Sequence, residues 1–449
     1  MNKVNFRKSL TPLYVYPKIC KYSDIIEDAE SFLKPLNDGD IGENNELLVY
    51  IHIPFCKNLC LYCSYYKEPL HQYTDNVIEE LIESYIKEIE MYANFGFFRN
   101  KVLKAIQIGG GTPTDIDTKL IVRLIDTVKA YFGTSQCELI GMEGNAATLQ
   151  NLDSLKNLQK AGVSKISFGV QTFNEELRKK LNIKTKIDDI YSAAYNIKLA
   201  GINQIAVDLM INLPDQTEEQ LLEDAQKIVA IDPDYIDVYG LNVFPNTRFK
   251  KILDGKTLFE EFPDDMRYLK AYQTIKRELL RYGYQQVMVF TYAKPGLKAS
   301  IYERLFFSSN LLGIGPSSRS YLSGISFRNV SSVDGYLQSI SKGKFPIECG
   351  NYASENEKDE RKVVFFPNLL KCKKYDGIEK WEKEFNYLIK KGLVKELDDC
   401  YVLTDEGCLW PGNISRMFFS DEQIRKHNVS FFQSVINKDN PYNQDKMGI

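Results

Sequence analysis

The sequence predicts an α/β protein whose parallel sheet curls into a partial (β/α)6 barrel of the TIM type, followed by a smaller, mostly helical domain. Between residues 47 and 245, apolar segments of strand length alternate six times with segments of helical period. Such alternation is typical of a parallel sheet with helices outside. Because parallel crossovers are right-handed, six units in succession favour curling toward a barrel. Beyond Leu322 the alternation stops.

The strands and helices follow in a regular order. The first strand, LLVYIHIPF, is a nearly continuous apolar run, as in a strand buried on both faces. The further strands expected are KAIQIGG (104–110), CELIGMEG (137–144), KISFGVQ (165–171), INQIAVDLMINLP (202–214) and YIDVYGLNVFP (235–245). Helical period is found at 74–95, 118–132, 152–161, 174–200 and 218–231, with a short helix near 23–33.

The chain divides into four expected parts: a leader (1–46), a core (47–325), a C-terminal domain (326–430) and a polar tail (431–449). Residues 355–414 have mostly helical period with one hairpin at VKELDDCYVLTDEG, which is typical of a winged-helix-like domain. A packing module without chemistry is the alternative interpretation. The tail is polar enough to predict disorder.

Charge and hydropathy exclude some partners. The net charge is -3, which gives no reason to expect nucleic acid or an anionic membrane. The N-terminus lacks the apolar core of a signal peptide, and no apolar run approaches the roughly 18–20 residues that span a bilayer. We therefore expect a cytoplasmic protein without a membrane span.

Three of the nine cysteines crowd into eight residues, as Cys56, Cys60 and Cys63 with the spacing C-x3-C-x2-C. An odd number with one dense group favours reduced thiols and a metal cluster over a disulfide framework. The group follows the first strand, at the carboxyl end where β/α folds place their sites. The other six cysteines, Cys20, Cys137, Cys349, Cys372, Cys400 and Cys408, are scattered and are interpreted as small buried side chains.

Three thiolates can hold three irons of a [4Fe–4S] cluster and leave the fourth iron open. An open iron can bind an amine and a carboxylate, as in the methionyl part of S-adenosylmethionine (SAM). An electron from the cluster can then break the sulfonium bond to give methionine and a 5′-deoxyadenosyl radical. A structural zinc site with His52 as fourth ligand, or three unrelated structural cysteines, are the alternatives.

The string YIHIPFCKNLCLYCSYY resembles the signature of the HemN-like radical SAM family, the family of oxygen-independent coproporphyrinogen III oxidases. Further strings match it in order: IGGGTPT (108–114), MEGN around Glu143, ISFGVQTFN (166–174), DLMINLPDQT (208–217), YGLNVFPNT (239–247) and LLGIGPSS (311–318). The likeness runs from Tyr50 to Leu322 and more loosely to Ile414. It implies the partial barrel of radical SAM enzymes, a [4Fe–4S] cluster and one or two SAM molecules.

The resemblance also implies roles for single residues. Cys56, Cys60 and Cys63 would hold the cluster, and the remaining positions would contact SAM: Tyr50, Gly110, Gly111, Thr112, Glu143, Gln171 and Asp208. Asp208 lies in an otherwise apolar strand, where an unpaired carboxylate is costly; a buried partner for a backbone or Lys group is the alternative. Family members often carry an arginine about twelve residues after the glutamine. That position is Ile183 here, and Lys184 is the nearest cation that can compensate.

Three features bear on the branch of the family. Tyr65 stands where the decarboxylating branch usually has a fourth cysteine, and YERLFFSSNLLG stands where the haem-chaperone branch usually has HNxxYW. The motifs resemble most closely the haem-utilisation and methyl-transferring (class C-type methyltransferase) members, in which a second SAM would lie near Gly111, Thr112 and Val243. We therefore expect a tetrapyrrole or another conjugated ring as substrate and a flavodoxin or ferredoxin as electron donor. The alternatives are a coproporphyrinogen III dehydrogenase and a non-catalytic haem-binding chaperone, for which the sequence offers only His52, His71 and His427 as imidazole ligands.

Overall fold

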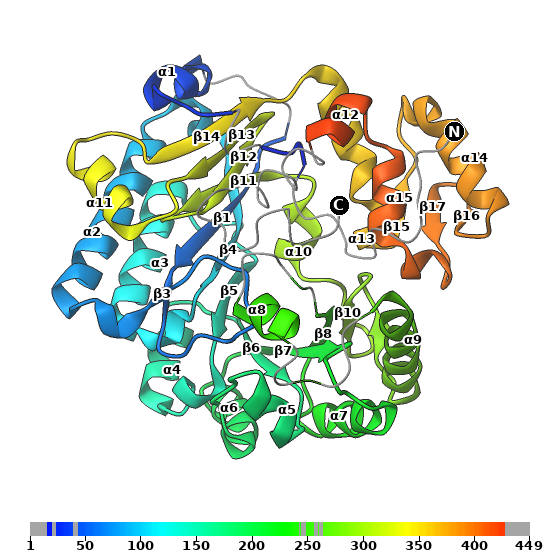
Figure 1. Cartoon of the computed structure of the whole chain (residues 1–449). Coiled ribbons are helices and arrows are strands. Elements are labelled where there is room, and N and C mark those ends of the chain that lie inside the picture. The colour runs from blue at the N-terminus through cyan, green and yellow to red at the C-terminus, as the bar shows by residue number, and fades with distance from the viewer. Residues whose placement is uncertain are drawn as a thin grey trace.

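A computed structural model describes residues 16–19, 24–38, 44–241, 243, 248–255, 259 and 264–426 of the chain. All six predicted strands are present, and each pairs with the next in parallel (Figure 1). They are β1 (Glu46–Ile53), β4 (Val102–Gly110), β5 (Leu139–Gly144), β6 (Lys165–Gln171), β7 (Gln204–Ile211) and β8 (Tyr235–Gly240). The predicted partial barrel is confirmed.

The sheet extends beyond these strands at both edges. β11 (Asn310–Ile314) pairs in parallel with β1, and β12 (Arg319–Leu322), β13 (Ile325–Asn329) and β14 (Ile347–Tyr352) follow it in antiparallel order. At the other edge β10 (Thr291–Ala293) pairs antiparallel with β8 and with β9 (Gln285–Gln286). The predicted boundary between residues 325 and 326 falls inside β13, so the division of the chain into domains stays a proposal.

Helices cover the outer face of the parallel strands (Figure 1): α2 (Asp75–Ala93), α3 (Thr118–Phe132), α4 (Leu152–Lys160), α6 (Ile187–Leu199) and α7 (Glu218–Ala230). The single helix predicted over 174–200 is wrong. The chain forms α5 (Glu175–Lys180) and then α6, because Asn182 adopts a left-handed conformation with φ of 58° and ends the first helix.

The strands alternate between a helix-facing side and a barrel-facing side. In β1, Leu47, Val49, Ile51 and Ile53 join the large core beneath the helices, whereas Leu48 packs in a separate cluster with Tyr50. By the same period of two, the inner positions of the other strands include polar residues and glycines. They are Gln107, Gly109, Gly141, Glu143, Lys165, Gly169, Asp208 and Asp237.

Two more helices pack on the outer layer: α9 (Asp265–Arg281) on α7 and α11 (Val333–Ser341) on α2. The other elements before the C-terminal region are α1 (Ala29–Leu33), β2 (Phe55–Cys56), β3 (Glu68–Pro69), α8 (Arg248–Gly255) and α10 (Ile301–Phe306). α10 packs on β4 and β1 from the barrel side, since Ile301 and Tyr302 join the Leu48 cluster.

The C-terminal region pairs helices with a small sheet, as predicted. Its helices are α12 (Glu355–Val364), α13 (Phe366–Leu369), α14 (Glu382–Lys390) and α15 (Pro411–Met417), and its strands are β15 (Lys371–Lys373), β16 (Val394–Glu396) and β17 (Cys400–Leu403). The predicted hairpin is the antiparallel pair β16–β17. The predicted polar tail lies outside the described residues.

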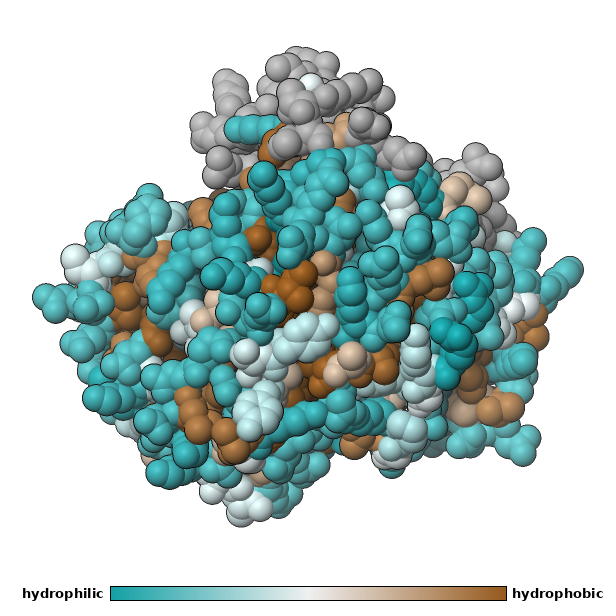
Figure 2. Space-filling model, turned by 90° about the horizontal axis from the view of Figure 1, so that it is seen from below, coloured by the Kyte–Doolittle hydropathy of each residue, from teal (hydrophilic) through white to brown (hydrophobic). Residues whose placement is uncertain are grey.

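The outer surface of the molecule carries both hydrophilic and hydrophobic side chains. The face that Figure 2 presents is mostly hydrophilic, with apolar patches between polar side chains. Among the described residues, no helix combines the length and the apolar character that crossing a bilayer requires.

Candidate functional site

The cysteine loop begins at the end of β2 and is held by neighbours on both sides. The Cys56 Sγ atom lies 3.4 Å from the Thr112 hydroxyl, and the Lys57 amide donates to the Asp115 carboxylate at 2.6 Å. Farther along, the Asn182 amide group donates to the Leu59 carbonyl at 2.9 Å. The loop is therefore fixed by the turn after β4 and by the segment between α5 and α6.

The three thiols lie close enough to influence one another. Burial raises the pKa of Cys56 to about 11, the hydrogen bond with Thr112 opposes this increase, and the charges of Cys63, Asp115 and Cys60 add to it. Burial also raises the pKa of Cys60, and Cys63 adds to it. Among the described residues, no three His, Cys, Asp or Glu side chains converge on a single-ion site. A cubane spreads its ligands over separate irons, and soft thiolates are the donors it prefers, so the trio fits the cluster.

His52 cannot serve as a fourth zinc ligand, because both of its ring nitrogens are engaged. Nε2 lies 3.0 Å from the Tyr66 carbonyl, and Nδ1 lies 3.2 Å from the Tyr50 hydroxyl. A carbonyl only accepts, so Nε2 carries the proton and Nδ1 accepts from Tyr50. Burial lowers the pKa of His52 to about 4, which keeps the ring neutral. The zinc interpretation with His52 is therefore excluded, and His52 instead fixes the Tyr50 hydroxyl.

The glycine turn after β4 lies against the start of the cysteine loop. The Gly111 amide donates to the Ile53 carbonyl and the Thr112 amide to the Phe55 carbonyl, both at 2.7 Å. A Cβ on Gly111 would come within 2.5 Å of the Phe55 oxygen, and one on Gly110, whose φ is +115°, would meet the His52 ring at 2.7 Å. Only glycine permits this approach, which leaves the strand end open for a ligand.

Glu143 and Asp208 bring two carboxylates to the barrel interior. The Gly110 amide donates to Glu143 at 3.2 Å, and burial nevertheless raises the pKa of Glu143. The Asp208 carboxylate makes no hydrogen bond to any described residue. Burial first, and then the Glu143 charge, raise the pKa of Asp208 to about 7. Two carboxylates with spare acceptor capacity match a ligand that carries hydroxyl donors, such as a ribose.

Gln171 ends β6 in an unusual conformation. Its φ is 69°, and the pairing of β6 with β7 shifts register between Gly169 and Gln171. Such a bulge re-aims a side chain. A Cβ on Gly169 would lie 2.2 Å from the Gln171 Nε2 atom, so the amide occupies the space that this glycine leaves open.

Arg178 is a residue that the sequence reasoning missed. Its guanidinium donates to the carbonyls of Val170 and Thr172, which flank Gln171, at 2.6 and 2.7 Å, and to the Thr185 carbonyl at 2.5 Å. These bonds stabilise the left-handed Gln171. No local sequence signal identifies this role, because every partner is a backbone carbonyl.

Ile183 and Lys184, which stand where similar proteins often carry an arginine, have different surroundings. Ile183 packs in an apolar cluster with Leu61, Tyr62 and Val243, whereas Lys184 is exposed. Lys184 is therefore not placed as a substitute, and Val243, proposed near a second SAM, lies beside apolar side chains. Of the other histidines, His71 is exposed and His427 lies outside the described residues.

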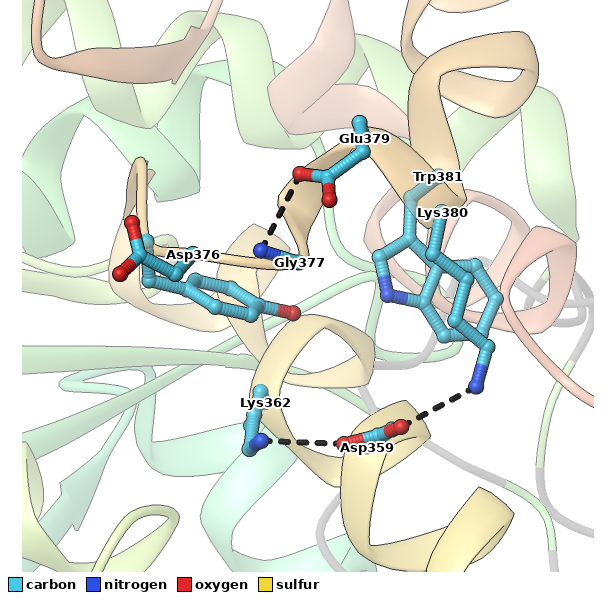
Figure 3. Close-up of a pocket in the computed structure, with 8 residues that line it drawn as sticks. Asp359, Lys362, Asp376, Gly377, Glu379, Lys380 and Trp381 are labelled. Carbon is cyan, nitrogen blue, oxygen red and sulfur yellow. Dashed lines mark hydrogen bonds and ion pairs between the residues drawn. The ribbon is translucent and has the colours of Figure 1, made fainter.

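A second concavity lies on the C-terminal region (Figure 3). This cavity of about 360 Å³ is lined by Tyr375, Trp381 and charged residues. Its two lysines, Lys362 and Lys380, pair with Asp359 at 3.0 and 3.2 Å. No sequence-predicted site residue lines this cavity.

A thiol trio at the carboxyl edge of a partial β/α barrel defines a radical SAM protein, and the Radical SAM superfamily matches residues 50–228. The chain resembles HemN-like proteins within that class, and a [4Fe–4S] cluster and SAM are the cofactors of radical SAM proteins. The solved structure of coproporphyrinogen III oxidase (HemN) from Escherichia coli shares the fold, with a TM-score of 0.75 and 22% identity over 91% of this chain and 96% of that one.

Two curated relatives carry different names. The heme chaperone HemW of Bacillus subtilis is 26% identical over 83% of this chain and 99% of its own. The anaerobilin synthase of Escherichia coli O157:H7 is 25% identical over 82% of each chain. The family is thus shared by proteins of different activity.

Proposed function

We propose that this protein is a radical SAM enzyme that acts on a tetrapyrrole, by anaerobic opening and methylation of haem, or on another conjugated ring, by methyl or methylene transfer. The observation that carries the proposal is the arrangement around the thiol trio. Tyr62 and Tyr65, which flank the last thiol, lie within electrostatic reach of both Cys63 and the barrel-facing Asp208. The Asp208 carboxylate has no hydrogen-bond partner among the described residues, and Tyr65 stands in place of a fourth cysteine.

In this proposal Cys56, Cys60 and Cys63 hold the cluster. When bound, the cluster and SAM supply one-electron chemistry strong enough to break an unactivated C–H bond, given an electron from a donor such as flavodoxin or ferredoxin. The chain's own residues would orient SAM. The Gly110–Thr112 turn would hold its amino-acid part, and Tyr50, whose hydroxyl is fixed by His52, would lie beside that part.

The nucleoside part of SAM would contact the carboxylates of Glu143 and Asp208 and the side-chain amide of Gln171. Glu143 and Asp208 would accept hydrogen bonds from the ribose hydroxyls, and Gln171, held in its left-handed conformation by Arg178, would bond the same group. Such a preorganised set fixes the reacting atoms without rearrangement.

A second candidate is a haem-binding chaperone, favoured by the name of the HemW relative. Residues 302–313 contain no histidine, and His52 has both ring nitrogens engaged. A decarboxylating dehydrogenase is a third, favoured by the fold it shares with coproporphyrinogen III oxidase; Tyr65 in place of the fourth cysteine counts against it.

One experiment separates the candidates. The full chain is reconstituted without air and incubated with SAM, a reductant and either haem or coproporphyrinogen III, and the products are analysed by mass spectrometry. We expect 5′-deoxyadenosine together with haem that has gained one methyl group. Loss of two carboxyl groups from coproporphyrinogen III would instead identify the dehydrogenase. Haem binding without any 5′-deoxyadenosine would contradict the proposal and favour the chaperone.

A further inference from the structure

Tyr65 lies close to charged groups of the candidate site, yet most of its surface is exposed. The Glu143 and Asp208 carboxylates and the Cys63 thiol lie within electrostatic reach of its hydroxyl. Nevertheless Tyr65 is 73% exposed. An aromatic residue two positions after the last thiol of the trio is thus left uncovered beside the site.

Hydrogen bonds hold the backbone on both sides of Tyr65. The Lys67 ammonium donates to the Cys63 carbonyl at 2.6 Å and to the Tyr65 carbonyl at 3.2 Å. The next carbonyl, that of Tyr66, accepts from His52, and the Tyr66 hydroxyl donates to Glu68 at 2.8 Å. The exposure of Tyr65 therefore does not come from a loosely held loop, and the ring is presented in advance of binding.

The groups around Tyr65 determine which kind of ligand can bind against its ring. Glu143 and Asp208 are carboxylates. The half-buried Tyr50 ring lies within reach of Tyr65, the half-buried Tyr302 ring lies near Glu143, and the half-buried Tyr62 ring lies near Asp208. Such a surface repels anionic groups and offers aromatic faces. It suits the uncharged, planar part of a conjugated ring, whose anionic substituents would point away from the barrel.

We propose that Tyr65 is a substrate-binding residue whose ring stacks on the planar face of a conjugated macrocycle, at the position where decarboxylating relatives carry a cysteine. This inference rests on the proposed function and adds to it the residue that recognises the substrate ring. Loss of an aromatic side chain on which a flat ring stacks weakens binding by about tenfold or more, which sets the scale for an isolated ring contact.

The test measures haem binding to the full, anaerobically reconstituted chain by absorption and fluorescence titration. Tyr65→Phe keeps the ring, Tyr65→Leu keeps apolar bulk without a π face, and Tyr195→Ala removes a tyrosine of similar exposure, 66%, from the outer helix α6. We expect Tyr65→Phe and Tyr195→Ala to bind haem within about twofold of the wild type, and Tyr65→Leu to bind about tenfold or more weakly. Iron and sulfide contents and melting temperatures establish that each variant is folded and loaded.

The outcomes separate the two proposals. If the wild type binds haem and Tyr65→Leu binds it equally well, the role of Tyr65 is overturned while the proposed function stands. If the wild type binds haem and modifies it but Tyr65→Phe loses binding as strongly as Tyr65→Leu, the hydroxyl and not the ring face is the contact, and stacking is overturned. If the wild type neither binds nor modifies haem, both proposals fail.

Discussion

Asp208 and Asp237 lie side by side in the same register on β7 and β8, yet they have different surroundings. Asp237 accepts from the Thr291 hydroxyl at 2.5 Å and lies near the ion pair of Lys165 with Glu303, which measures 2.9 Å. The Asp208 carboxylate has no hydrogen bond to any described residue, although Asp208 also lies in a parallel strand of the barrel. The β8 side of the barrel interior is therefore paired within the protein, and the β7 side is left open.

The difference shows where to look for a ligand. Burial raises the pKa of both aspartates, so both carboxylates pay for desolvation. The Lys165 cation lowers the pKa of both aspartates, but only Asp237 also receives a hydrogen bond, from the Thr291 hydroxyl. The Asp208 carboxylate therefore keeps acceptor capacity that a bound molecule can use.

The largest effect is expected from removing a thiol on the open side. Cys60→Ala leaves two cysteines, too few to hold the cubane with one open iron. Iron content and 5′-deoxyadenosine formation should fall to the level of protein without a cluster. Cys137→Ala is the control, since Cys137 is half-buried at the start of the β5 segment and outside the trio. Retention of iron and turnover by Cys60→Ala would refute the site.

On the paired side, Lys165→Met should act on stability. The side chains of Lys165 and Glu303 are 8% and 23% exposed, and the substitution leaves Glu303 and Asp237 without their cation. Breaking such a buried pair costs about 3–5 kcal/mol. Urea denaturation should show this loss, and the double variant Lys165→Met/Glu303→Leu should recover much of it. A single variant as stable as the wild type would show that the pair does not compensate the buried charge.

Asp208→Asn should weaken SAM binding, by about 10- to 100-fold, because a hydrogen bond to a charged group is worth about 1.5–3 kcal/mol. The wild-type affinity should rise as the pH increases through about 7, since the pKa of Asp208 is raised to about 7 and only the ionised carboxylate accepts both ribose donors. Equilibrium dialysis at pH 6, 7 and 8 measures this.

Two variants sharpen that result. The pH dependence should be absent in Asp208→Asn, and Asp237→Asn, the neighbour in register, should bind SAM like the wild type. Equal losses in the two variants would remove the distinction between the open side and the paired side.

The sequence predicts the barrel and the thiol trio because both are local patterns. It also identifies Asp208, as a carboxylate in an apolar strand, but YIDVYG carries Asp237 in the same kind of strand. The two cannot be told apart from the sequence, because the partner of Asp237 is Thr291, 54 residues away. Arg178 is missed for a different reason: its partners are nearby backbone carbonyls, which no side-chain pattern reveals. The break in the predicted helix 174–200 depends on one left-handed residue, Asn182.

The smallest effect is expected for Arg178→Lys, which keeps the charge but cannot bond all three carbonyls with one planar group. Gln171 would then hold its left-handed conformation less firmly, and SAM affinity should fall about three- to tenfold while the melting temperature changes little. Hydrogen exchange at residues 170–172 should become faster, which a loss of bulk stability alone would not confine to that segment. Lys184→Met, which removes the exposed neighbouring cation, should leave SAM affinity unchanged. A loss of affinity with Lys184→Met and none with Arg178→Lys would move the role from the buried guanidinium to the exposed ammonium.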